Sequence, residues 1–340
     1  MIQRSGERII KVAVLGFESF APLPIIGPID ILNESCTLQK KALGPRESRT
    51  TFDVELVSLS RKPLHFDGVV TLLPQTTISQ IKRPDLILIP SSGPKILQLL
   101  EPLRAYIPWL QTCSAAGTRV VGMCTGVFLL AETGLLNRRT ATTHWNFADL
   151  FRRKYPAVNL RPERLIVDEG NVITSGAATS FTDLALYLIE LYCGHEAAVL
   201  TAKVLLLEMG RYTQLPYTIF STQKTHDDRE VLRIQQFMEH KFNEHLTIEF
   251  LARRAGMSGR NFSRRFQRAT GELPSLYLQK LRIEKAKRLL ESTDSSISDI
   301  MQKVGYSDER SFRRLFRSLT ELPPKLYRKQ YAMNALRAGH

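Results

Sequence analysis

The sequence predicts two domains: an α/β domain with a flavodoxin-like parallel sheet and helices on both faces, then an all-α domain with two helix-turn-helix motifs. Three observations lead to this prediction. Short apolar stretches alternate with helical patterns over residues 1–207, an internal repeat lies within residues 227–335, and positive charge is concentrated in the second region. At 340 residues the chain is long enough for two domains.

Four stretches of the first region have the length and composition of strands. Residues 9–17, 85–90 and 118–123 are largely apolar, as in buried parallel strands, whereas residues 52–59 alternate and are expected nearer a sheet edge. Strands that alternate with helices predict a parallel sheet covered on both faces. The helical patterns occupy residues 96–114, 126–133, 145–155, 181–192 and 196–208.

Residues 208–226 show no clear period and are predicted to link the two domains. The expected organisation is an α/β domain over residues 1–207, this linker, and a helical domain over residues 227–335. From Asp227 onward the chain has 23 Lys and Arg against 14 Asp and Glu, which places +9 of the total net charge of +14 in the last third. This asymmetry favours a polyanionic partner for the helical domain.

The helical domain contains two copies of one unit. Anchor residues recur at an offset of fifty, and upstream of a Gly-x-Ser turn the offset is forty-nine, so the extra residue is expected just after that turn. The pairs at offset fifty are Phe262/Phe312, Arg264/Arg314, Phe266/Phe316, Thr270/Thr320, Pro274/Pro324, Leu276/Leu326 and Tyr277/Tyr327; those at forty-nine are Ile248/Ile297, Leu251/Ile300, Gly256/Gly305 and Ser258/Ser307.

Each copy is predicted to be a helix, a turn and a second helix whose two Phe residues face the core. Ser258 is expected to cap the second helix of the first copy. Long polar side chains cover its outer face, where Arg can bind guanine and Asn or Gln can bind adenine. The expected DNA contacts are Arg260, Asn261, Ser263, Arg264 and Gln267 in a motif over about 246–268, and Glu309, Arg310, Arg313 and Arg314 in one over about 295–318.

A helix over residues 274–291, roughly 25 Å long, is expected to hold the two reading helices at a fixed separation. Successive major-groove faces of DNA are roughly 34 Å apart, so one chain is expected to read two groove segments on one side of the duplex. The alternative is a pair of helical hairpins with solvated basic faces. Residues 227–332 resemble the DNA-binding domain of AraC/XylS transcription regulators, on the strength of residues 256–271, 305–307, 311–317 and 324–328. Glu321 stands where that family usually has Gly, and Met301 where it has a small residue.

The cysteines, Cys36, Cys113, Cys124 and Cys193, are scattered and have no zinc-site spacing, so neither a metal nor a cofactor is expected. The first eight residues are polar and lack the apolar core of a signal peptide. No apolar run approaches the roughly 20 residues that a membrane span needs. These features predict a cytoplasmic protein that does not enter the membrane.

Residues 120–131 read as a strand, a tight turn at Cys124 and a helix, which is the arrangement of a nucleophile elbow. The helix N-terminus is expected to favour the thiolate of Cys124. His144 lies twenty residues further on and is a candidate neighbour of the thiol. It is equally well explained as a buried histidine that serves packing alone.

Residues 9–205 resemble the class I glutamine amidotransferase-like superfamily, in particular its PfpI branch, through residues 27–30, 122–126, 135–136, 141–145 and 174–176. The resemblance implies an elbow Cys, often with a His and an acidic residue. Pro24 stands at the position of that acid, so Cys124 and His144 are expected to be vestigial and no catalysis is expected. A ligand pocket is expected there, at Cys124, Thr125 and His144.

The two resemblances together match a known architecture of transcription regulators. The expectation is a sequence-specific regulator of double-stranded promoter DNA, an activator that contacts RNA polymerase, whose first domain senses an unidentified small molecule and forms a homodimer. Two alternatives stay open: a cysteine-dependent hydrolase or hydratase-like enzyme fused to a DNA-binding domain, and a thiol redox sensor.

Overall fold

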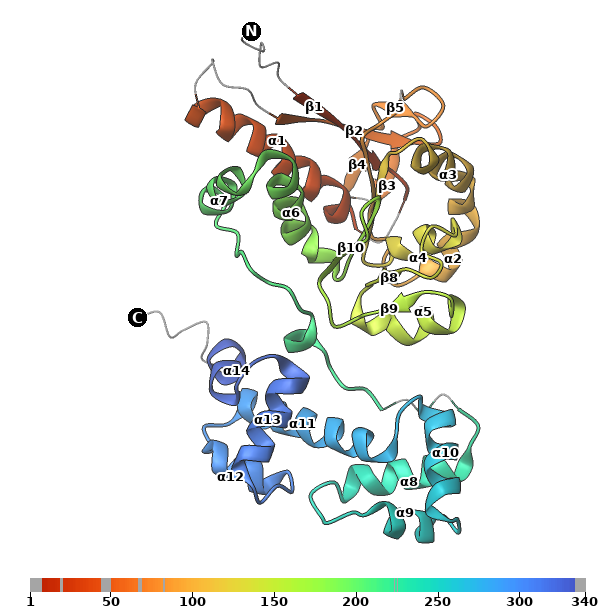
Figure 1. The fold of residues 1–340 in the computed structure, drawn as a ribbon, viewed down its shortest axis with the longest axis vertical. Coiled ribbons are helices and arrows are strands. Elements are labelled where there is room, and N and C mark those ends of the chain that lie inside the picture. The colour runs from red at the N-terminus through yellow and green to blue at the C-terminus, as the bar shows by residue number, and fades with distance from the viewer. Residues whose placement is uncertain are drawn as a thin grey trace. The chain divides into compact units, whose positions relative to one another are not determined.

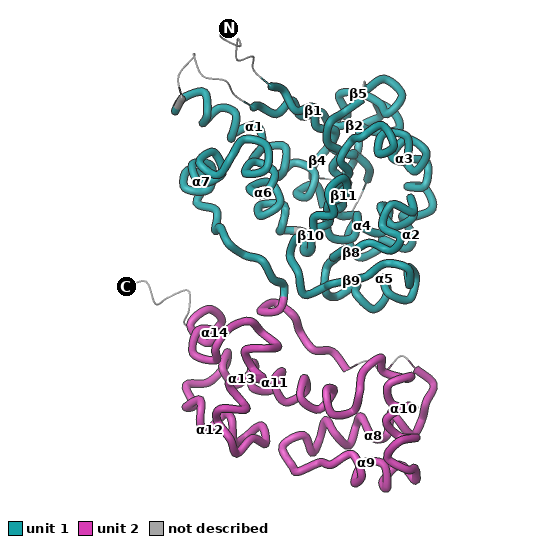
Figure 2. Tube along the Cα trace, viewed as in Figure 1, with its two compact units in different colours: residues 1–214 teal, residues 215–340 magenta. Residues whose placement is uncertain are grey.

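The computed structural model describes residues 8–333 apart from 19–20, 44–49, 67–68, 82, 223 and 225. The chain divides into two compact units, Met1–Gln214 and Leu215–His340 (Figure 1, Figure 2). The polar start that the sequence analysis singled out lies outside the described residues except for Arg8, as do the last two residues of the expected helical domain. Among the described residues, no helix is both long and apolar enough to cross a membrane.

The first unit is built on a sheet in which seven strands are described, in the order β10-β11-β7-β6-β1-β2-β5. All neighbouring pairs are parallel except β10 and β11. The strands are β1 (Arg8–Leu15), β2 (Thr50–Ser58), β5 (Thr76–Thr77), β6 (Leu86–Ile89), β7 (Arg119–Met123), β10 (Ile166–Asp168) and β11 (Val172–Ser175). Two small pairs lie outside it: β3 (Leu64–Phe66) with β4 (Val70–Leu72), and β8 (Thr140–Ala141) with β9 (Asn159–Leu160).

Helices cover both faces of this sheet, which confirms the predicted fold class (Figure 1). One face packs against α2 (Ile96–Leu103), α3 (Ile107–Ala115), α4 (Gly126–Glu132) and α5 (Ala148–Lys154). The other face packs against α1 (Leu23–Leu43), α6 (Phe181–Cys193) and α7 (His195–Val204). The predicted edge-side strand is β2, which has only the two-residue β5 beyond it.

The helices α1, α2 and α3 of the first unit differ from the sequence prediction. The prediction of a single helix over residues 96–114 is wrong. The stretch forms two helices, α2 and α3, which are separated by a 3₁₀ turn over Arg104–Tyr106. Pro108 lies in the first turn of α3, where its missing N–H costs nothing, and so it starts a new helix. The 21-residue α1 was not predicted, and Pro28 lies inside it, where a helix is not expected from sequence.

The second unit is helical in its described part. It contains α8 (Arg229–His240), α9 (Ile248–Arg254), α10 (Gly259–Thr270), α11 (Pro274–Ser292), α12 (Ile297–Lys303), α13 (Glu309–Thr320) and α14 (Pro324–Tyr331), after a 3₁₀ turn η4 (Leu215–Tyr217). The helix pairs α9–α10 and α12–α13 are the two predicted helix-turn-helix motifs. Each has its own apolar core, around Phe262 and Phe266 in one and Phe312 and Phe316 in the other.

The helix caps explain the change of offset between the two copies. Ser258 caps α10 by accepting a hydrogen bond from the Asn261 N–H, as predicted. In the second copy the cap of α13 is Asp308, which accepts from the Ser311 N–H at 2.9 Å. The extra residue therefore lies between Ser307 and the helix, and α13 begins fifty residues after α10.

Candidate nucleic-acid interface and sensory site

The outer face of α10 carries the residues expected to contact DNA in the first motif. Arg260, Asn261, Arg264 and Gln267 are exposed, and Ser263 is half-buried between them. The Arg264 guanidinium donates to Asn261 Oδ1 at 3.2 Å, so these two neighbours on the same helix face hold each other. The side chains of Phe262 and Phe266 have no exposed area. Their burial on one side of α10 orients the polar side of the helix toward the solvent.

The face of α13 is arranged in the same way but is chemically different. Glu309, Arg310, Arg313 and Arg314 are all exposed. Glu309 Oε1 accepts from Arg313 Nε at 2.6 Å one turn along the helix, and both side chains are about half exposed. Such an exposed ion pair contributes little to stability, roughly 0.3–0.5 kcal/mol, so it leaves Arg313 available to a stronger acceptor.

Arg265 on α10 has a structural role. Its Nε lies 2.5 Å from Asp228 Oδ2, and Asp228 also caps α8 by accepting from the Val231 N–H. Burial works to raise the pKa of Asp228, but the hydrogen bonds from Arg265 and Val231 outweigh it and lower that pKa. Arg265 thus ties α10 to the start of α8 and is turned away from the reading face, while its neighbour Arg264 stays on it.

The helix α11 joins the two motifs and belongs to both cores. Tyr277, Leu278 and Leu281 pack with the first motif. One turn further on, Ile283, Ala286 and Leu290 pack with the second. The predicted connecting helix is confirmed, and its 19 residues correspond to about 28 Å.

The elbow predicted in the first unit is present. Strand β7 ends at Met123, Cys124 has a φ of 53°, and α4 begins at Gly126. This left-handed conformation is strained for a non-glycine residue and is typical of a nucleophile elbow. Gly126 is required by close packing, since a Cβ there would lie 2.4 Å from the Pro90 carbonyl oxygen.

The thiol of Cys124 is nevertheless buried, with 3% of the residue exposed. Burial raises the pKa of the Cys124 thiol, and hydrogen bonds with Ser91 and Thr125 offset this rise only in part. Burial thus acts against the thiolate that was expected at the helix N-terminus. Desolvation disfavours the charged form more than the helix end and its amides favour it.

The structure brings Thr143, the residue before His144, against the elbow. The Thr143 hydroxyl donates to the Cys124 carbonyl oxygen at 2.7 Å. His144 is held by its own segment: its Nδ1 accepts from the Asn146 N–H at 3.1 Å, and its ring lies 5.3 Å from that of Trp145. Burial lowers the pKa of His144, which favours the neutral ring.

Thr125, the third expected pocket residue, organises the neighbouring loop. Its fully buried Oγ1 accepts from the N–H groups of Ser92 and Gly93, both at 3.0 Å, and lies 3.1 Å from Ser91 Oγ. By contrast Ser175 Oγ, also fully buried, has no partner among the described residues. Ser175 lies at the elbow, because its carbonyl oxygen accepts from the Cys124 N–H at 2.8 Å.

The acidic residue that the resemblance implies is absent from its expected place. Pro24 is buried in the first turn of α1. Glu18, the nearby carboxylate in sequence, is exposed and accepts from the His65 N–H at 3.2 Å. Neither residue supplies a carboxylate to Cys124 or His144.

The segment expected to be a linker contains a residue that sequence reasoning missed. Gln214 is 1% exposed, and its Nε2 lies 2.8–3.0 Å from the carbonyl oxygens of Thr143, Pro162 and Arg164. Its side chain also packs on Gly176, where an added Cβ would lie 2.4 Å away. An aperiodic segment gives no signal for this, since every partner is at least 38 residues away in sequence.

Comparisons with known proteins agree with both halves of this description. Residues 251–330 match the model of a helix-turn-helix domain, and residues 10–191 match that of the DJ-1/PfpI family. The HTH-type transcriptional regulator CdhR of Pseudomonas aeruginosa is 30% identical over 246 residues, 71% of each chain. An isonitrile hydratase of Pseudomonas putida is 28% identical over 192 residues, 56% of this chain and 75% of that enzyme.

Among solved structures, a putative transcriptional regulator protein from Vibrio parahaemolyticus is 25% identical with a TM-score of 0.51. The match covers 58% of this chain and all of that one. The DJ-1/PfpI model spans more than half of the sequence, and CdhR matches across most of its own length. The chain belongs to the AraC-type helix-turn-helix transcriptional regulators that carry a DJ-1/PfpI domain.

Proposed function

We propose that α10 and α13 read two successive major-groove segments on one side of promoter DNA. The observation that carries this proposal is the exact repetition of the presenting frame: the cap, the first helical residue and both Phe anchors recur at an offset of fifty. The two outer faces, which need not be alike for packing, differ in chemistry. That pattern is typical of one scaffold that presents two different reading surfaces.

In this proposal the exposed side chains have separate roles. Arg264, held by Asn261, and Arg313, held by Glu309, are placed to contact base edges. The other exposed donors contact bases or phosphates nearby; they are Arg260, Ser263, Gln267, Arg310 and Arg314. Because Arg binds guanine in a bidentate manner, a preorganised Arg contributes both affinity and specificity.

The first unit is proposed to sense a small molecule at the elbow. Open parallel sheets bind ligands at the carboxyl ends of their strands, and Cys124 and Ser175 are at the ends of β7 and β11. The unpartnered Ser175 hydroxyl supports a polar ligand group there, because an unsatisfied buried hydroxyl costs about 1–3 kcal/mol. In this proposal His144 borders the site, because it follows Thr143, whose hydroxyl donates to the Cys124 carbonyl oxygen. Thr125 keeps the loop over residues 91–93 in place.

The ligand is proposed to act by a population shift. It must bind the active and inactive states with different affinity to change their ratio. The same proposal includes a homodimer in the cytoplasm and activation through contact with RNA polymerase. Transcription from a selected promoter, measured with purified protein, polymerase and metabolite pools, tests it: equal operator affinity and equal transcription under all conditions contradict a sensory role.

A second candidate function is a cysteine-dependent enzyme, favoured by the strained elbow at Cys124 and the similarity to an isonitrile hydratase. The burial of the thiol, its raised pKa and the apolar Pro24 support the regulator without catalysis instead. Hydration of isonitriles by the purified protein, abolished by Cys124→Ala, would establish the enzyme. A redox sensor is tested by operator binding before and after treatment with peroxide.

The first experiment is selection of genomic DNA fragments by the purified chain at physiological salt, followed by sequencing. Enriched fragments that share two short blocks about one helical turn apart support the proposed reading by two helices. Enrichment that is only salt-sensitive, without a shared sequence, points to nonspecific attraction by the basic unit.

A further inference from the structure

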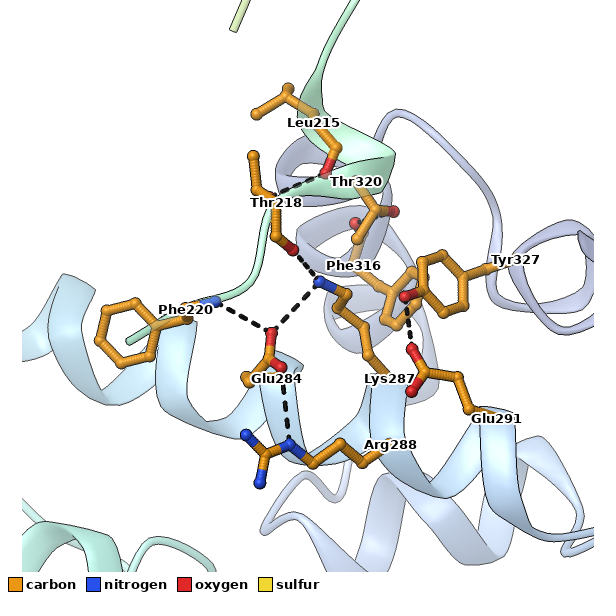
Figure 3. A network of polar contacts seen from close by, with 10 residues as sticks. All are labelled: Leu215, Thr218, Phe220, Glu284, Lys287, Arg288, Glu291, Phe316, Thr320 and Tyr327. Atoms are coloured by element: carbon orange, nitrogen blue, oxygen red, sulfur yellow. Dashed lines mark hydrogen bonds and ion pairs between the residues drawn. The ribbon is translucent and has the colours of Figure 1, made fainter. Parts of the chain in front are cut away.

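The residues Leu215–Phe220, here called the clasp, lie beside α11 and α13 in the second unit (Figure 3). At one end the Tyr217 ring lies 6.3 Å from that of Tyr331 on α14, which packs with the second motif. At the other end the Phe220 ring lies 5.2 Å from that of Tyr277, which packs with the first motif. The clasp thus contacts a residue of each core.

Between these ends the clasp is fastened to α11 by two buried charges. Lys287 Nζ donates to the Thr218 carbonyl oxygen and lies 3.2 Å from Glu284 Oε2 (Figure 3). The same carboxylate oxygen accepts from the Phe220 N–H at 3.2 Å. Glu284 is 7% exposed and Lys287 5%, so the pair is covered by the chain that it holds.

The Glu284–Lys287 pair lies near the middle of α11. Glu284 and Lys287 follow Leu281, the last residue of the first core, and lie on the part of α11 that packs with the second core. A buried ion pair is weak evidence for stability, because apolar residues of similar size often serve as well. Charged groups add directional hydrogen bonds. Here the bonds from Lys287 to Thr218 and from Phe220 to Glu284 fix the position of the clasp along α11.

We infer that Glu284 and Lys287 are positioning residues: through the clasp they hold the two helix-turn-helix motifs in the relative orientation that two-site DNA reading needs. The inference rests on the proposed reading of two groove segments by α10 and α13. When both motifs are held rigidly, binding by the second is intramolecular and the two affinities reinforce each other. A loosened clasp keeps each motif folded but lowers that reinforcement.

The test uses the full-length chain and two duplexes: one with both selected sequence blocks, and the same duplex with one block scrambled. The wild type is expected to prefer the two-block duplex by about 100-fold or more. The double variant Glu284→Met, Lys287→Met removes both charges together, so neither is left unpaired. Its preference is expected to fall about tenfold, with one-block affinity within twofold of wild type and the melting temperature retained.

Block spacing gives a readout that a purely structural role does not change. Adding one base pair turns one block relative to the other by about 35°. The wild type is expected to lose affinity sharply, whereas the double variant is expected to tolerate the change. Tyr217→Ala, which removes the ring contact with Tyr331, is a milder second variant with the same expectation. Tyr212→Ala, whose side chain is 69% exposed and lies before the clasp, is the matched control.

The outcomes separate the two proposals. If the wild type shows no preference for the two-block duplex, the proposed reading by two helices fails and the inference fails with it. If the wild type shows the preference and both variants keep it with unchanged dependence on spacing, the positioning role alone is wrong. Equal loss on both duplexes also overturns it, because it indicates damage to each motif separately.

Discussion

The side-chain amide of Gln214 donates to the Thr143 carbonyl oxygen at 2.9 Å, and so the last residue of the first unit is held beside the elbow. The Thr143 hydroxyl in turn donates to the Cys124 carbonyl oxygen. Residue 215, the next in the chain, begins the clasp of the second unit.

Gln214→Ala is expected to destabilise the first unit by about 2–4 kcal/mol, because it removes the side-chain amide donor from the carbonyl oxygens of Thr143 and Pro162. The Arg164 carbonyl oxygen still accepts from the Thr142 hydroxyl at 2.7 Å. Thermal unfolding measures the effect. Gln98→Ala on the exposed face of α2 is the matched control and should stay within about 0.5 kcal/mol of wild type. A Gln214 variant as stable as that control contradicts the anchoring role.

Arg264→Ala and Arg313→Ala are each expected to lower DNA affinity by about 1–3 kcal/mol and to relax the preference at one base pair. Selection from a randomised operator measures both effects. A loss that is uniform across sequences identifies a phosphate contact instead. The neighbour Arg265 provides the control, because its guanidinium is occupied by Asp228: Arg265→Ala should lower stability and leave base preference unchanged.

Phe266→Ala and Phe316→Ala are each expected to cost roughly 3–5 kcal/mol, since both rings are fully buried. Phe266 and Phe316 belong to different cores, so each substitution should loosen its own motif first. Hydrogen exchange resolved by segment checks this. If either variant has the same melting temperature as the wild type, the assignment of these two Phe residues to the cores is wrong.

These comparisons show why some features could be predicted from sequence and others not. The repeated Phe pairs, the Gly turns and Ser258 act within a few residues, so their spacing predicted both motifs and the cap of α10. The contacts of Gln214 with Thr143, of Lys287 with Thr218 and of Asp228 with Arg265 each join residues 37 or more apart in sequence, so no local pattern marks these contacts. The helix α1 was missed for a local reason, because Pro28 lies where a helix interior is not expected.

Glu321 is expected to lower the stability of the second motif, and a single substitution at this position is expected to raise it. It ends α13 with a φ of 57°, whereas the equivalent Gly271 ends α10 with a φ of 80°. A side chain in this left-handed conformation is strained, so Glu321→Gly should stabilise the second motif by about 1 kcal/mol. The reciprocal change Gly271→Glu should destabilise the first motif by a similar amount. Denaturant unfolding of both variants checks the sign, and equal stability of all three proteins refutes the strain.

The thiol of Cys124 is expected to react slowly. Its burial and raised pKa keep it neutral near pH 7, so the rate of alkylation by iodoacetamide in the folded chain should be far below that of a free cysteine. Because the folded pKa lies above the unfolded one, the unfolded chain loses this proton first as the pH rises. The stability that the neutral thiol contributes is thus fully present below the unfolded pKa and is lost as the pH rises through the folded pKa. Mass spectrometry of each cysteine against pH, with Cys124→Ser as the reference, measures the rate; rapid labelling of Cys124 at pH 7 would instead indicate the thiolate of an active enzyme.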